Sequence, residues 1–151
     1  MYQQILCPVD GSETSIFGMH EAILLAKSLN AQLRFLYVID LYFPVMNISG
    51  EFDTVYLDDI LRKHGQKVLQ QAENEANSAG VKADSKIVET IGHRVSELIL
   101  DEAKSWPADL IIMGTHGLRG IERIVIGSDA ESVVRKCSVP VLLVKNKGKA
   151  N

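Results

Sequence analysis

The sequence contains few of the side chains on which disulfide-rich and metal-binding proteins depend. It has two cysteines in 151 residues, Cys7 and Cys137, and neither has a second cysteine near it in the chain. We therefore expect no disulfide and no cysteine metal site, and we interpret both as small buried apolar residues. The histidines likewise lack the spacing of metal ligands. They are His20, His64, His93 and His116.

The charge and hydropathy of the chain exclude further classes of protein. The net charge is −3, without the basic surplus that binders of nucleic acid or of anionic membranes usually carry. No apolar run approaches the roughly 20 residues that span a bilayer. The start of the chain, Met1 to Gln4, lacks the basic and apolar stretches of a secretory signal. We therefore expect a cytoplasmic protein with neither nucleic acid nor membrane as a partner.

Strand-like and helix-like patterns alternate along the chain. Short apolar runs predict strands over residues 4–9, 31–39, 81–88, 109–113 and 141–144. Between them, apolar spacings of three and four predict helices that begin after Ser12, near Leu57, at Val95 and at Ser128. The residues expected on the buried face of the first helix are Ile16, Met19, Ile23 and Ala26. This order predicts one α/β domain, residues 1–151, with an open five-stranded parallel sheet and helices on both faces.

Two segments depart from the alternation. The connection from Asp40 to Thr54 is long and contains the apolar run Leu41 to Met46. A loop of this length is often a lid or a contact surface, and the alternative is an apolar flap folded onto its own domain. Residues 145–151 are polar and are expected to form a flexible tail.

The segment from Gly114 to Ser128 carries the most specific pattern in the chain. It reads Gly-x₂-Gly-x₉-Gly-Ser and joins a predicted strand to a predicted helix. Glycines at a strand exit let backbone N–H groups come close to a ligand, and a helix start adds unpaired N–H groups and partial positive charge. Because these features favour a phosphate group, the segment predicts a nucleotide site.

The exits of the first and fourth strands are expected to face each other. In an open parallel sheet, ligands bind beyond the carboxyl ends of the strands where the strand order reverses, and we expect that reversal between these two strands. The first exit carries Asp10, whose carboxylate suits sugar hydroxyls or an amino group. The alternative is that Asp10 serves only as a cap for the following helix.

The glycine pattern differs from two common nucleotide-binding motifs, the Gly-x₄-Gly-Lys-[Ser/Thr] phosphate loop and the Gly-x-Gly-x₂-Gly dinucleotide fingerprint. Together with Asp10 and the ending Val139-Pro140-Val141-Leu142-Leu143-Val144, it resembles the ATP-binding members of the universal stress protein family. The resemblance runs from Ile5 to Val144. It implies a Rossmann-like fold of the adenine nucleotide alpha hydrolase-like type.

The resemblance also implies a cofactor, ATP with or without Mg²⁺, and a set of residues around it. The family's binders hold the adenine and ribose near the exits of the first, second and fourth strands, and the phosphates at the glycine motif. The implied residues are Pro8, Val9 and Asp10 near adenine and ribose, Val38 and Ile39 beside the base, Met113 and Gly114 beside the ribose, and Gly117, Gly127 and Ser128 at the phosphates.

One position departs from the family's pattern. After Gly127 and Ser128 the binders usually have an apolar or hydroxyl residue, whereas this chain has Asp129 followed by Ala130. A carboxylate close to phosphates repels them unless a cation intervenes. The interpretation we favour is that Asp129 lies in the first helical turn and points to solvent, where it complements the helix dipole.

The glycine segment also carries basic side chains. Arg119 and Arg123 would offset phosphate charge if they faced the ligand, and the alternative is that both are plain surface arginines. His116 either contacts a phosphate or is solvated within the loop, and we favour the second interpretation.

The last strand predicts a partner. Pro140 has no N–H to donate and therefore favours an edge or a strand start, and the four apolar residues Val141–Val144 follow it. An exposed edge of this kind invites pairing. In the family that the chain resembles, the last strands commonly meet across a homodimer. We predict a homo-oligomer, at least a dimer, through Val141–Val144.

Three functions compete at this point. The favoured one is a nucleotide-dependent regulatory module in the stress response. The second is a slow ATPase or phosphotransferase, against which we count the lack of an evident general base or paired metal carboxylates beside the glycines. The third is a nucleotide-free dimeric interaction protein, with Asp129 as the sign of lost binding.

Overall fold

Five parallel strands form a sheet in the computed structural model of this protein, which describes residues 1–41, 54–115 and 126–146. Their order across the sheet is β3-β2-β1-β4-β5, and all neighbouring pairs are parallel. The predicted α/β fold with a five-stranded parallel sheet is thereby confirmed. The strands are β1 (Gln4–Pro8), β2 (Gln32–Asp40), β3 (Ala83–Thr90), β4 (Leu110–Gly114) and β5 (Val141–Val144).

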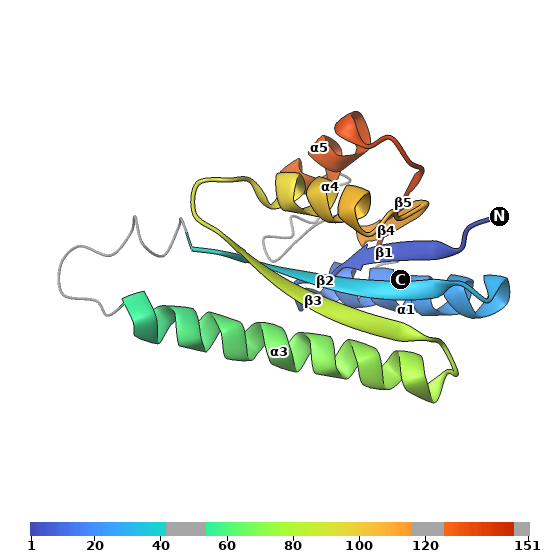
Figure 1. Ribbon diagram of the computed structural model, residues 1–151, viewed down its shortest axis with the longest axis horizontal. Helices are drawn as coiled ribbons and strands as arrows, with labels where there is room; N and C mark the ends of the chain where they lie inside the picture. The colour runs from blue at the N-terminus through green and yellow to red at the C-terminus, as the bar shows by residue number, and fades with distance from the viewer. Residues whose placement is uncertain (42–53, 116–125, 147–151) are drawn as a thin grey trace, which may run out of the picture.

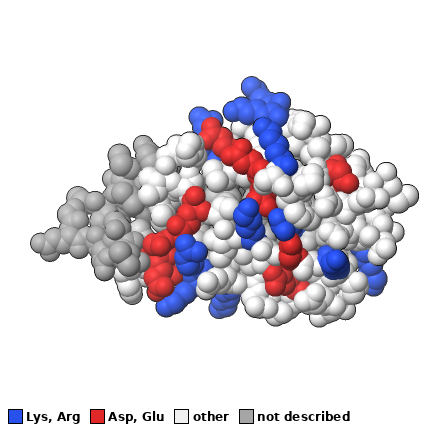
Figure 2. Space-filling view, viewed as in Figure 1, with Lys and Arg blue, Asp and Glu red and all other residues white. Residues whose placement is uncertain are grey.

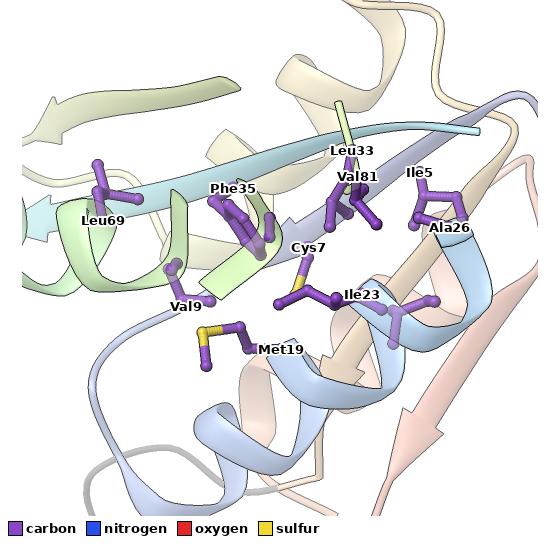
Figure 3. Packing of buried hydrophobic residues seen from close by; sticks show 14 of the residues in the cluster. Ile5, Cys7, Val9, Met19, Ile23, Ala26, Leu33, Phe35, Leu69 and Val81 are labelled. Carbon is purple, nitrogen blue, oxygen red and sulfur yellow. The ribbon is translucent and has the colours of Figure 1, made fainter. Parts of the chain in front are cut away.

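Helices cover both faces of the sheet, as predicted (Figure 1). On one face lie α1 (Glu13–Leu29) and α3 (Thr54–Ser78), and on the other lie α4 (Val95–Ser105) and α5 (Ser128–Lys136). Each interface holds its own cluster of buried apolar side chains. Figure 3 shows the cluster around Phe35 that joins the sheet to α1 and α3.

The ends of α1 and α3 follow from local sequence signals. Ser12 is the N-cap of α1, and its Oγ accepts a hydrogen bond from the N–H of Ser15 at 3.2 Å. After α1, Asn30 adopts the left-handed conformation with a φ of 53°. After α3, Gly80 does so with a φ of 77°, a conformation that glycine adopts without steric cost. The predicted start of the first helix after Ser12 is therefore confirmed.

The pairing of β2 with β3 extends beyond the predicted strand ends. The two strands are in register from Leu33 opposite Ala83 to Asp40 opposite Thr90. The third strand therefore begins and ends two residues later than the pattern of residues 81–88 predicts. Asp40 is the last residue of β2 and lies at the carboxyl edge of the sheet, opposite Thr90 of β3.

The buried face of α1 differs from the predicted one. Ile16 was predicted to be buried and is 38% exposed, whereas Ser15 and Gly18 are buried. The reason is a close approach between α1 and the exit of β4, where a Cβ on Gly114 would lie 2.7 Å from the carbonyl oxygen of Thr14. Glycine at 18 and at 114 lets the start of α1 lie against the end of β4.

The cysteines are free thiols in different surroundings. Cys7 is fully buried in the core, where desolvation raises the pKa of its thiol. Cys137 follows α5 and is half-buried rather than buried, which corrects the prediction for it.

The described surface carries both signs of charge. Acidic and basic side chains are interspersed on the face shown in Figure 2 and form no basic stripe there. Within the described residues, no helix is long and apolar enough to cross a membrane. The predicted lid or flap lies mainly at 42–53 and the predicted tail mainly at 147–151, outside the described residues.

Candidate functional site

A cavity of about 630 Å³ opens at the carboxyl ends of the strands. Its walls come from the ends of β1, β2 and β4, the start of α5, and side chains of α3 and α4. β1 and β4 are neighbours in the sheet although they are far apart in the sequence, so the strand order reverses here as predicted. Sites for small molecules typically enclose roughly 300–1,000 Å³, and this cavity lies within that range.

The structure brings the described members of the predicted site together at this cavity. They come from four separate parts of the chain and lie side by side on its wall. These residues are Pro8, Val9, Asp10, Val38, Ile39, Met113, Gly114, Gly127, Ser128, Asp129 and Ala130. His116, Gly117 and Arg119, together with Arg123, lie outside the described residues.

Other lining residues were missed by the sequence interpretation. They are Ser15, Leu36, Tyr37, Asp40, Leu61, Val95, Ile99 and Thr115. Asp40 and Thr115 carry a readable signal, since each lies at a strand exit where parallel sheets bind ligands. The remaining apolar residues carry no signal for a ligand site, because an apolar pattern in the sequence indicates only that a residue is buried.

Asp10 combines a structural role with a place on the cavity wall. Its Oδ1 accepts a hydrogen bond from the N–H of Ser12 at 2.9 Å, and its own N–H donates to Oγ of Ser15 at 3.0 Å. The carboxylate thus holds the turn between β1 and α1, while Ser12 caps the helix. The capping role considered for Asp10 therefore belongs to Ser12, and Asp10 holds the turn while it lines the cavity.

The start of α5 lines the cavity and carries N–H groups without a partner inside the helix. The first N–H groups of a helix have no acceptor within it, which applies here to Ser128, Asp129 and Ala130. Gly127 differs from the expectation, because its N–H donates to the carbonyl oxygen of Thr115 at 2.7 Å. Its amide therefore anchors α5 to the end of β4 rather than facing a ligand.

Asp129 lies in the first turn of α5 as predicted, but it does not simply point to solvent. It is half-buried on the cavity wall, and its Oδ1 accepts a hydrogen bond from the N–H of Ser96 at 3.3 Å. The pKa of Asp129 is raised, mainly because burial removes its carboxylate from water. The nearby charges of Asp40 and Asp10 raise it further. The Ser96 hydrogen bond and the charge of Arg94 oppose this shift. The packing of α4 against α5 is the reason for this inward position.

Tyr37 closes the cavity on the side of α3. Its ring meets the ring of His64 edge-on, with centroids 6.1 Å apart. α3 comes this close because residue 65 is glycine, where a Cβ would lie 2.7 Å from the Tyr37 ring. Burial raises the pKa of Tyr37, and the charge of Asp10 raises it further, so the phenol stays protonated at neutral pH.

Comparison with known proteins decides the family. The model of the universal stress protein family matches residues 1–145. This chain belongs to the universal stress protein family. Among its relatives, universal stress protein MJ0531 of Methanocaldococcus jannaschii is 34% identical over 145 residues, which are 96% of this chain and 83% of that protein.

Solved structures of universal stress proteins share this fold. A family member from Burkholderia pseudomallei is 31% identical, with a TM-score of 0.79 over 95% of this chain and 96% of that one. Another universal stress protein, crystallised in complex with cAMP, is 25% identical, with a TM-score of 0.66 over 95% of this chain and 97% of that one. That homologue binds an adenine nucleotide.

Proposed function

We propose that this universal stress protein binds an adenine nucleotide, ATP with or without Mg²⁺, and acts as a nucleotide-dependent regulatory module in the stress response. The observation that carries the proposal is the cavity itself. All described residues that the sequence assigned to a nucleotide site line this one space, although they come from distant parts of the chain. The homologue in complex with cAMP supports the same class of ligand.

The cavity offers a distinct surface to each part of a nucleotide. The end of β2, at Val38 and Ile39, lines the part of the cavity where we place the adenine. Asp10 and the exit of β4 at Gly114 also line the cavity, and the Asp10 carboxylate offers an acceptor for the ribose hydroxyls. The start of α5 at Ser128 offers N–H groups, a hydroxyl and the positive end of the helix dipole to phosphate.

Asp10→Asn tests the proposed ribose contact. Asparagine keeps an oxygen to accept the Ser12 N–H, so the turn is retained and only the charged acceptor is lost. A hydrogen bond to a charged group contributes about 1.5–3 kcal/mol, so we expect the Kd for adenosine-containing ligands to rise about tenfold to a hundredfold in calorimetry.

The control is Asp101→Asn on the exposed side of α4, which removes the same charge away from the cavity and should leave affinity unchanged. Denaturing the purified wild-type protein and analysing the small molecules released gives an independent test. The proposed function would be refuted if the protein retained no nucleotide and also showed no measurable binding of ATP, with or without Mg²⁺.

We also propose a homodimer through β5. This strand is at the end of the sheet beyond β4, and Leu142 is 38% exposed on it, with Val134 of α5 47% exposed. Leu142→Lys places a charge on that edge and is expected to convert the dimer to a monomer in light scattering at micromolar concentration. Leu24→Lys, at a more exposed site on α1, should leave the dimer intact. A wild-type monomer would contradict the proposal.

A further inference from the structure

The described wall of the cavity carries negative charge. Asp10 and Asp40 line it from the exits of β1 and β2, and Asp129 lines it from the first turn of α5. The described part of the lining contains no lysine, arginine or histidine. Here the positive end of the α5 dipole, which attracts phosphate, meets a full negative charge in the same helical turn.

Asp129 is fixed in this wall rather than free to turn away. The hydrogen bond from the Ser96 N–H holds its carboxylate between α4 and α5. The side chain is half-buried, and its charge interacts unfavourably with those of Asp40 and Asp10, while Arg94 offsets part of this. A phosphate chain at the start of α5 would add like charge in a partly desolvated place, where Coulomb repulsion is stronger than in water.

We propose that Asp129 sets a selectivity for phosphate charge in this cavity. Its carboxylate lowers the affinity for an adenine ligand more as the negative charge of the ligand's phosphate group increases. Adenosine and its monophosphates therefore compete effectively with free ATP, and ATP binds best when Mg²⁺ neutralises part of its charge. This inference rests on the proposed function and deepens it, because it defines the preferred ligand by charge.

Calorimetry on the full chain with adenosine, AMP, ATP, and ATP with excess Mg²⁺ tests the selectivity. Asp129→Asn keeps an oxygen to accept the Ser96 N–H and removes only the charge. We expect this variant to bind free ATP about tenfold more tightly, which is about 1.4 kcal/mol, with a smaller gain for AMP and less than about a twofold change for adenosine.

The matched control is Glu131→Gln. Glu131 lies in the same first turn of α5, is exposed, and pairs with Arg135 at 3.0 Å away from the cavity. Its substitution removes the same charge from the helix and should change the affinity of each ligand by less than about twofold. A gain in ATP affinity equal to that of Asp129→Asn would show a general charge effect and overturn the inference.

Two further outcomes separate the inference from the function on which it rests. Mg²⁺ should raise the ATP affinity of the wild type more than that of Asp129→Asn. If all four ligands bind and the substitution shifts them equally, the selectivity is refuted while the proposed function stands. If neither protein binds any of the four ligands, the proposed function is refuted and the selectivity with it.

Discussion

Glu102→Ala is expected to lower the free energy of unfolding by about 3 kcal/mol, because it removes the buried centre of a charge network. Glu102 is 4% exposed, and its two oxygens accept hydrogen bonds from Arg34 at 2.9 Å and Lys86 at 2.6 Å. Arg34 also pairs with Asp84 at 2.7 Å and lies 4.6 Å from the ring centroid of Trp106. With alanine at residue 102, the partly buried Arg34 keeps only its exposed partner, Asp84.

The comparison for this variant is Glu131→Ala, which removes a glutamate from an exposed pair with Arg135 four residues away. Pairs of this kind contribute about 0.5 kcal/mol or less. Urea unfolding followed by circular dichroism gives both free energies by linear extrapolation. Equal losses for the two variants would mean that the Glu102 network adds nothing beyond a surface pair.

Gly114→Ala is expected to lower the free energy of unfolding by about 2–3 kcal/mol and to abolish the proposed nucleotide binding. The new Cβ would lie 2.7 Å from the carbonyl oxygen of Thr14, a backbone atom that cannot turn aside. The start of α1 must therefore move away from β4. The turn that carries Asp10 leads directly into α1, so the cavity wall moves with it.

Gly80→Ala separates loss of stability from loss of the site. Gly80 has a φ of 77°, and a Cβ added to it would have open space around it, so alanine costs backbone strain alone, about 1 kcal/mol. This variant lies after α3 and away from the cavity lining, and its nucleotide affinity should match the wild type. If Gly114→Ala binds nucleotide as tightly as Gly80→Ala, the close approach of α1 to β4 does not shape the site.

The order of strands and helices could be predicted from the sequence because local patterns encode it. The spacing of apolar residues shows whether a segment has the period of a helix or of a strand. Helix starts, here at Ser12 and Ser128, are likewise marked by residues close together in the sequence. The glycine pattern and Asp10 likewise belong to strand exits, and the rule that parallel strands expose their carboxyl ends at one edge predicts that they meet. The position of the cavity therefore followed from the sequence.

The direction and partners of individual side chains were decided by tertiary packing. The position of Asp129 in a first helical turn was predictable, but its inward orientation depends on Ser96, a residue of another helix. The N–H of Gly127 likewise donates to the carbonyl oxygen of Thr115, which follows another element, β4. A sequence pattern reports the geometry of its own element, whereas these contacts depend on how separate elements pack.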